Sequence, residues 1–416
     1  MSVRSMPARS MSPRSLSARS VPARSKITRA APAALRAIAR AARPAETRAT
    51  RLLFLIVGFG VAAWAPLVPL VKARAGLDDG RLGLLLLCLG IGSLATMPVA
   101  GALAGRFGTR PVLAVAVFVT GTALMVLSRA AGLPVLAAAL TGLGIGLGLL
   151  DCLMNLQAVA VERRAERPMM SGFHGLYSLG CILGAAGFSA LLSLGLTPAA
   201  ATLGVVAAIA AAFLVALPGI LPAVADGPGG PAFALPRGPV LGIGLLCFVV
   251  FLTEGSALDW SGVFLIQERG LDPARAGLGY AAFSLTMTAG RLSGDALVRR
   301  IGRRRIVVLG ALLAAAALGL ATAVPLWPAT LLGYALVGAG CANIVPVLFT
   351  AAGRLETVPA VLAIPAVTTL GYAGVLAGPA AIGLLAHATS LTLAFLAVAA
   401  LLLAVAVAAG AGRLRL

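Results

Sequence analysis

Long apolar runs recur along almost the whole chain and restrict it to a narrow set of folds. At about 1.5 Å per residue, each run is long enough to cross roughly 30 Å of hydrocarbon as a helix. Only 11% of the 416 residues are charged, whereas a soluble domain is usually about 25% charged. The sequence therefore predicts an all-α membrane protein with twelve transmembrane helices. The runs are 52–71, 82–104, 112–130, 133–160, 169–194, 198–217, 240–267, 276–298, 306–324, 329–350, 359–386 and 390–410.

A segment rich in proline and glycine, 218–239, divides the runs into two groups of six. This composition is typical of a linker, so we expect it to join an N-terminal half, 52–217, to a C-terminal half, 240–410. The halves also repeat, because residues 102–110 match residues 296–304 at an offset of 194. The repeat predicts two pseudo-symmetric six-helix halves.

The basic residues predict the orientation. Residues 1–51 hold 12 Lys or Arg against one acid, and so supply much of the net charge of +20. Their low-complexity Arg-Ser repeats favour a disordered, solvated cytoplasmic tail. Contact with anionic lipid or nucleic acid is the alternative, and we expect no nucleic-acid partner. Beyond the tail, loops on the side of the N-terminus hold 14 arginines and the opposite loops hold 6 basic residues. This asymmetry predicts a cytoplasmic linker and two cytoplasmic termini, the C-terminal one being 411–416.

A carboxylate lies deep inside the fourth apolar run. Asp151 is roughly 15 Å from Glu162, at the charged end of the same helix, and is therefore close to the bilayer midplane. Asn155 shares its helix face, and Gly144 and Gly148 lie on that face too, which predicts open space beside the polar pair. An ionisable residue at this depth is costly, so it is a functional candidate by default. We expect Asp151 to lie in a central cavity.

The second half supplies further candidates for this cavity. At an offset of 192, Asn343 matches Asp151, and repeated halves commonly bind solute at their interface. Glu254 also lies near the middle of its run and is interpreted either as a proton carrier or substrate ligand, or as a structural partner of Arg291. Asp259 lies nearer the outside, where it either joins the cavity or faces water.

Aromatic residues and a histidine complete the set of candidates. His174 and Tyr177 lie three residues apart near the inner end of their helix and suit either a substrate contact or an inner gate. A buried histidine bonded to its neighbours is the alternative for His174. Trp64, Tyr280, Tyr334 and Tyr372 are candidates for stacking on a solute, although aromatic residues in membrane helices more often pack or anchor at the interface. Trp260, beside Asp259, is a further candidate for the cavity.

The repeated basic loops and three further stretches carry a family resemblance. The chain is similar to the major facilitator superfamily and, within it, to a bacterial branch related to fucose permease. In the family's loop motif, Gly105 stands in the first copy where an acid is usual, and Arg299 stands in the second. The resemblance implies that Asp151 couples protons or binds a sugar. The three stretches are Asp151 to Asn155 with Glu162 and Arg163, residues 173–180, and residues 254–260. The resemblance also implies a cytoplasmic gate of Arg106, Arg110, Glu162, Arg163, Arg291, Asp295, Arg300 and Arg304.

The sequence thus predicts a monomeric secondary transporter in a bacterial inner membrane. It is expected to import a small polar solute, sugar-like or an organic metabolite, with protons by alternating access. Efflux of drugs or metabolites in exchange for protons is the alternative. An intramembrane enzyme is the other class considered, but neither a nucleophile motif nor a metal motif is present. No cofactor and no metal is expected, because the five cysteines lie in apolar runs without metal-ligand spacing.

Overall fold

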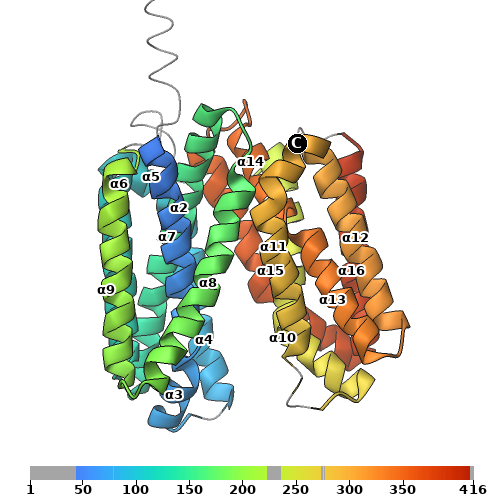
Figure 1. Cartoon of the computed structure of the whole chain (residues 1–416), viewed down its shortest axis with the longest axis horizontal. Helices are drawn as coiled ribbons and strands as arrows, with labels where there is room; N and C mark the ends of the chain where they lie inside the picture. Colours follow the sequence, from blue (N-terminus) through green and yellow to red (C-terminus); the bar gives the residue numbers. More distant parts are fainter. Residues whose placement is uncertain (1–43, 78, 223–235, 273–274, 276, 413–416) are drawn as a thin grey trace, which may run out of the picture. The chain divides into compact units, whose positions relative to one another are not determined.

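The structure is a computed structural model that describes residues 44–412 except 78, 223–235, 273–274 and 276. These residues belong to one compact unit made of helices and connecting turns (Figure 1). Eleven helical segments in the described part are long and apolar enough to cross a membrane. A further helix, α11 (Leu278–Ile301), packs among them but carries charged residues that lower its hydropathy. The predicted all-α membrane fold is confirmed, and α11 accounts for the predicted twelfth helix.

The N-terminal half contains two helices that are interrupted near a proline. Pro66 precedes α3 and Pro98 lies in the 3-10 turn η1, because proline lacks the N–H that a continuous helix needs. The elements are α2 (Pro44–Ala63), α3 (Leu67–Ala75), α4 (Asp79–Thr96), η1 (Met97–Val99), α5 (Ala100–Phe107), α6 (Thr109–Leu127), α7 (Leu133–Ala165), α8 (Met170–Ser193), α9 (Pro198–Ala216) and η2 (Leu217–Gly219).

The C-terminal half contains a similar break. Pro346 cannot donate a hydrogen bond to the carbonyl of Ala342, four residues earlier, and the helix is interrupted between α13 and α14 at residues 342–343. The elements of this half are α10 (Gly238–Arg269), α11, α12 (Arg303–Ala323), α13 (Trp327–Cys341), α14 (Ile344–Gly353), α15 (Ala360–Ala388) and α16 (Leu391–Gly410).

The two repeated basic loops have the same backbone geometry. Gly108, between α5 and α6, has φ 85° and ψ 153°. Gly302, between α11 and α12, has φ 87° and ψ 154°. A residue with a side chain rarely adopts a positive φ, so the glycine is required in both loops. The offset of 194 found in the sequence is thus also present in the structure.

The first helix begins earlier than the sequence predicts. The boundary of the predicted tail was residue 51, but α2 starts at Pro44, and Ala49 and Thr50 are buried in the bundle. Amphipathic packing overrides the polar composition here, because the helix buries one face while its arginines remain on the other. The rest of the predicted tail, residues 1–43, lies outside the described residues, as do residues 223–235 of the predicted linker and residues 413–416.

Glycines allow neighbouring helices to pack closely. A side chain at Gly180 of α8 would clash with the backbone of α2, as small-residue contacts in membrane helices require. Gly144 and Gly148 of α7 lie in the same way against Leu89 and Ser93 of α4. The prediction that these two glycines leave open space beside Asp151 is therefore wrong, because α4 occupies that space.

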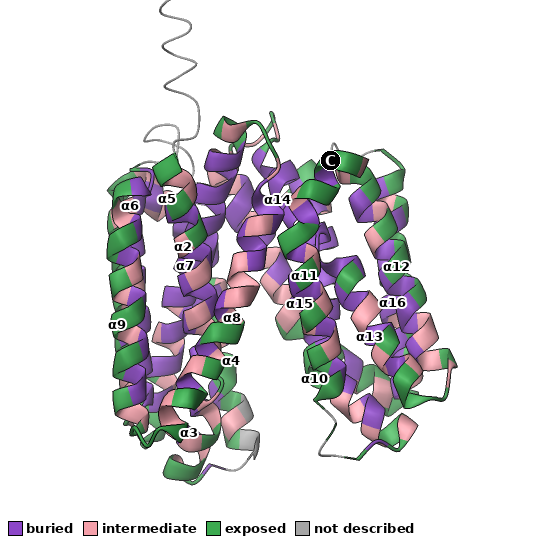
Figure 2. Ribbon diagram, in the orientation of Figure 1, coloured by how far each residue is buried: buried purple, intermediate pink, exposed green. Residues whose placement is uncertain are grey.

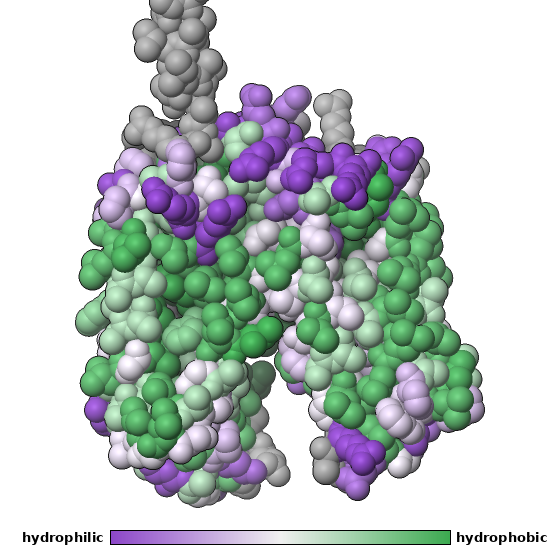
Figure 3. All heavy atoms as spheres, in the orientation of Figure 1, coloured by the Kyte–Doolittle hydropathy of each residue, from purple (hydrophilic) through white to green (hydrophobic). Residues whose placement is uncertain are grey.

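The polar and apolar surfaces are separated. Buried residues line the contacts between helices (Figure 2), while the sides of the bundle are predominantly apolar in the view of Figure 3. Exposed side chains such as Phe118 and Leu214, at 72% and 65% exposure, suit a surface covered by lipid. The hydrophilic residues gather at the ends (Figure 3). We call the end that carries Arg106, Arg163, Arg164, Arg299, Arg300, Arg304 and Arg305 the arginine-rich end.

Candidate functional site

A buried arginine lies where the two halves meet. Arg291 of α11 is 6% exposed, and each nitrogen of its guanidinium donates a hydrogen bond. Nη2 donates to Oε1 of Glu254 at 3.0 Å, and Nη1 donates to Oγ of Ser178 at 3.1 Å. Nε donates to the carbonyl of Ala342 at 3.4 Å. That carbonyl is available because Pro346 has no N–H to offer it.

Glu254 is therefore the partner of Arg291, which is one of its two interpretations from the sequence. The side chains of the pair are 7% and 19% exposed, so the charges compensate each other where little water is available. Ser178 lies on α8 in the N-terminal half, so the cluster of Arg291, Glu254 and Ser178 links the halves. The sequence assigned Arg291 to the gate, but the structure places its guanidinium with Glu254 instead of with Asp295.

Asp151 lies near the middle of α7 and is 8% exposed. Within the described part of the chain, no hydrogen bond or ion pair reaches its carboxylate. Its charge lies within electrostatic range of Tyr177 on α8 and Tyr372 on α15, so side chains from both halves converge on it. Nδ2 of Asn155 donates to the main-chain carbonyl of Asp151 at 2.9 Å, while its Oδ1 is buried without a partner.

His174 lies in an aromatic contact between the halves. Its ring is 5.2 Å from that of Phe54 on α2 and 5.8 Å from that of Phe349 on α14. Its Nε2 is buried and finds no hydrogen-bond partner among the described residues. None of the sequence interpretations of His174 included Phe349, because this contact joins residues far apart in the chain. Tyr177, one turn further along α8, is partly buried and lies within electrostatic range of Asp151 and Arg291.

The remaining cavity candidates have contacts or surroundings of their own. Asp259 is exposed, while Nε1 of Trp260 donates to the carbonyl of Pro379 at 3.2 Å and so holds α10 against α15. Trp64 is buried at the bend between α2 and α3. Asn343 donates from Nδ2 to the carbonyl of Gly290 at 3.0 Å, and its Oδ1 is buried without a partner in the described structure.

Two carboxylates cap the start of α8 at the arginine-rich end. Oε2 of Glu162 accepts hydrogen bonds from the amides of Met169 and Met170 at 2.9 and 2.8 Å. Asp295 accepts bonds from the next two amides, those of Ser171 at 3.0 Å and Gly172 at 3.0 Å. The first amides of a helix have no partner within it, and its N-terminus favours negative charge. Glu162 belongs to the N-terminal half and Asp295 to the other, so Asp295 holds the halves together at this end.

The equivalent contact in the other half has no carboxylate. At the offset of 194, Gly101 of α5 corresponds to Asp295. A side chain at Gly101 would clash with the backbone of Val361 near the start of α15. The residue before α15 is Pro359, which has no amide N–H to be capped. The two halves thus close against each other by a capped helix on one side and by direct backbone packing on the other.

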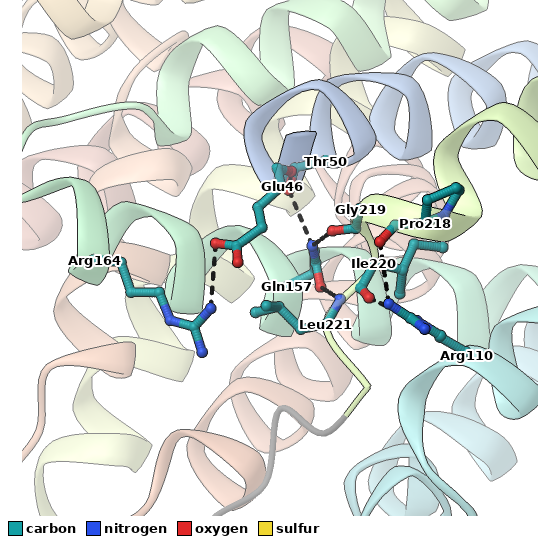
Figure 4. Close-up of polar contacts among 9 residues, drawn as sticks. All are labelled: Glu46, Thr50, Arg110, Gln157, Arg164, Pro218, Gly219, Ile220 and Leu221. Carbon is teal, nitrogen blue, oxygen red and sulfur yellow. Dashed lines mark hydrogen bonds and ion pairs between the residues drawn. The ribbon is translucent and has the colours of Figure 1, made fainter. Parts of the chain in front are cut away.

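A buried glutamine that the sequence analysis did not identify holds the start of the linker. Gln157 of α7 is fully buried (Figure 4). Its Nε2 donates to Thr50 Oγ1 at 3.4 Å and to the Gly219 carbonyl at 3.3 Å, and its Oε1 accepts from the Leu221 amide at 3.0 Å. The signal in the sequence was an amide inside an apolar run, where a polar group needs partners.

Arg110 also contacts the start of the linker. Its Nε donates to the Ile220 carbonyl at 2.8 Å, and its Nη2 donates to the Pro218 carbonyl at 3.1 Å (Figure 4). The sequence placed Arg110 in a gate between the halves, but these bonds join it to the start of the linker. The structure therefore gives Arg110 the role of a clamp on residues 218–220.

The other arginines assigned to the gate are exposed. Arg106 lies over the ring of Phe107 at 5.1 Å. Arg164, which follows Arg163 in the chain, pairs with Glu46 at 3.2 Å (Figure 4). Of the predicted gate, the structure thus brings together the carboxylates of Glu162 and Asp295 at α8. The exposed arginines among those assigned to the gate are Arg106, Arg163, Arg300 and Arg304.

Two pseudo-symmetric six-helix halves that meet over buried charges form the architecture of a secondary transporter, and the chain is a multi-pass membrane transporter. It belongs to the Major Facilitator Superfamily, whose family model matches residues 52–265 and 243–414. The resemblance drawn from the sequence is confirmed at this level, and the class is one of transporters.

Curated relatives and solved structures agree with this assignment. An uncharacterised MFS-type transporter of Yersinia pestis is 50% identical over 85% of this chain and 92% of its own length. The membrane protein MosC of Rhizobium meliloti is 33% identical over 83% of this chain and 85% of its own length. The E. coli fucose:proton symporter FucP has a TM-score of 0.71 at 15% identity, over 88% of this chain and 97% of that one. A bacterial homologue of the iron transporter ferroportin has a TM-score of 0.73 at 17% identity, over 89% and 99%.

Proposed function

We propose that this transporter imports a small polar solute together with protons, by alternating access. The observation that carries the proposal is the carboxylate of Asp151, which lies in the middle of a membrane-spanning helix without a partner among the described residues. Loss of hydration disfavours the charged form of such a group, and unpaired acids at this depth commonly serve proton relays. Glu254, by contrast, already has a cation beside it, so Asp151 is the better proton carrier.

The solute would bind between the halves, beside Asp151. Tyr177 of α8 and Tyr372 of α15 lie within electrostatic range of this carboxylate. The free Oδ1 of Asn155 offers an acceptor that a hydroxyl of the solute would satisfy. A sugar-like compound or another polyhydroxylated metabolite fits this set of groups. The similarity in fold to FucP, a fucose:proton symporter, is in line with that class.

The contacts between the halves support an outward-facing state. Asp295 and the start of α8 join the halves at the arginine-rich end, and Arg291 with Ser178 joins them deeper in the bundle. For solute to leave on the arginine-rich side, Asp295 must release the two amides of α8. Rocking of one half against the other around the central site would exchange these contacts for contacts at the opposite end.

The arginine-rich end is proposed to face the cytoplasm of a bacterium, with both termini on that side. Exposed arginines gather at this end, where Figure 3 shows hydrophilic residues, as positive residues do on the cytoplasmic side of bacterial membrane proteins. On this proposal the linker is cytoplasmic, and the transporter functions as a monomer with one central site.

The test is transport in proteoliposomes with and without a pH gradient. The wild-type protein is assayed against radiolabelled sugars, polyols and sugar acids, and a transported solute is expected to accumulate when the outside is acidic. Asp151→Asn is expected to lose accumulation but to keep solute exchange without a gradient. Glu268→Gln, which changes an exposed acid in the opposite half, is the matched control and is expected to behave as wild type. Accumulation that ignores the pH gradient would refute proton coupling, and accumulation driven by the reversed gradient would instead establish antiport.

A further inference from the structure

An apolar groove of about 810 Å³ lies between α6 and α9, on the outside of the N-terminal half. Its volume is within the 300–1,000 Å³ of typical small-molecule sites, yet it is separate from the central site. Gly121 brings α6 close to Val206 of α9, while Phe118 and Leu214 line the groove as exposed side chains. In a membrane-spanning bundle this face is turned toward lipid.

The groove is long and almost entirely apolar. Its lining extends along α6 from Ala114 to Val126, which is about 18 Å at 1.5 Å per residue and exceeds the roughly 15 Å of one hydrocarbon leaflet. Arg129 and Ala130, just beyond the end of α6, continue the lining. An extended acyl chain has this shape. The lining residues are Ala114, Val117, Phe118, Gly121, Thr122, Met125, Val126, Arg129, Ala130, Val206, Ile209, Ala210, Phe213 and Leu214.

One end of the groove is positively charged. Arg129 is exposed, and the described residues supply no ion pair or hydrogen bond to its side chain. Beside it, the guanidinium of Arg74 is fixed by hydrogen bonds to the carbonyls of Leu127, Ser128 and Ala130. The lining contains no acidic residue. A phosphodiester is the anion that a guanidinium binds well at the surface of a bilayer.

We propose that this groove is a specific phospholipid site, with an acyl chain between α6 and α9 and the lipid phosphate at Arg129. The apolar length and the charged end each match one part of a glycerophospholipid. Because Arg129 follows the end of α6 that is opposite the arginine-rich end, the lipid would come from the leaflet on that side. The site is independent of the solute and of proton coupling.

The experiment is native mass spectrometry of the full chain after delipidation in detergent. Protein incubated with dioleoyl phosphatidylglycerol is expected to retain one lipid per chain. Dioleoylglycerol, which has the same chains without phosphate, is expected to be retained at least fivefold less, and inorganic phosphate is not expected to be retained. Equal retention of dioleoylglycerol and phosphatidylglycerol would refute a role for Arg129.

Two pairs of variants separate the charge from the groove. Arg129→Gln is expected to lower retention of phosphatidylglycerol about fivefold, and Arg275→Gln, another exposed arginine at the same end, to leave it unchanged. Ala210→Phe, which fills the groove, is expected to lower retention to the same extent. Ala208→Phe is its control, because Ala208 is exposed on α9 outside the groove. Arg129, Arg275 and Ala208 are exposed and Ala210 is half-buried, and thermal melting should confirm that all four variants fold as the wild type does. Retention in Arg129→Gln and Ala210→Phe equal to that of their controls would overturn the proposal.

Discussion

Asp295→Asn is expected to weaken closure of the arginine-rich end. Asp295 accepts two hydrogen bonds, both of 3.0 Å, from the amides of Ser171 and Gly172 in the opposite half. Asparagine retains one accepting oxygen, but its NH₂ group faces the second amide, and the negative charge at the helix N-terminus is lost. A hydrogen bond to a charged group contributes about 1.5–3 kcal/mol. Because Asp295 is partly exposed, we expect the substitution to destabilise the closed arginine-rich end by about 2 kcal/mol in total.

This loss applies only to the state in which the two halves are in contact at α8. At about 1.4 kcal/mol per factor of ten, it would shift the equilibrium between the closed and open arginine-rich end by roughly thirtyfold toward the open state. Spin labels at Arg163→Cys and Arg300→Cys, in a background without the five native cysteines, report the distance between the halves. Both positions are exposed. Double electron–electron resonance is expected to show a larger population at long distance.

Glu166→Gln is the matched control, since it removes a negative charge from an exposed residue at the same end. It is expected to leave the distance distribution unchanged. If Asp295→Asn gives the same distribution as Glu166→Gln and wild type, the capped helix does not hold the gate, and the reasoning from its hydrogen bonds is refuted.

Three further predictions concern the stability of the bundle. Glu254→Gln should leave Arg291 buried beside a neutral group and lower the free energy of unfolding by about 3 kcal/mol, as measured by denaturant titration in detergent. Adding Arg291→Met should restore part of this loss, and no recovery would argue against the pair. Gln157→Ala removes bonds to the start of the linker and should cost about 2 kcal/mol, with faster hydrogen exchange at residue 221; unchanged exchange would contradict the clamp. Gly180→Leu should prevent α8 from packing against α2, because the added side chain meets the α2 backbone. Gly187→Leu should fold, since nothing lies within 4 Å of a Cβ added there. Equal yields of the two variants by size-exclusion chromatography would refute this packing.

The helices and their order could be predicted from the sequence because each depends on a local property. Length and apolarity define a membrane span without reference to partners, and the repeated basic loops indicate the pseudo-symmetry. The first boundary was wrong, since α2 starts at Pro44 through packing of Ala49 and Thr50. Composition alone cannot identify such a buried face inside a basic segment.

The site was less accessible to sequence analysis, because its contacts join distant residues. The depth of Asp151 could be counted along one helix, and so could that of Glu254. Pairing of Glu254 with Arg291 depends on the crossing of α10 and α11 and on the interruption caused by Pro346. Capping of α8 by Asp295 joins residues that are 124 and 123 positions apart in the chain. No periodicity reports on contacts of this kind.

The most direct test of the account is proton movement linked to solute binding and transport. Proteoliposomes with an internal pH-sensitive dye are given a transported solute without a preset pH gradient. The account predicts that inward movement of solute acidifies the lumen in the wild type, and that Asp151→Asn exchanges labelled solute at a measurable rate without acidification. Acidification by Asp151→Asn with the same number of protons per solute as the wild type would contradict the assignment of Asp151 as the proton carrier.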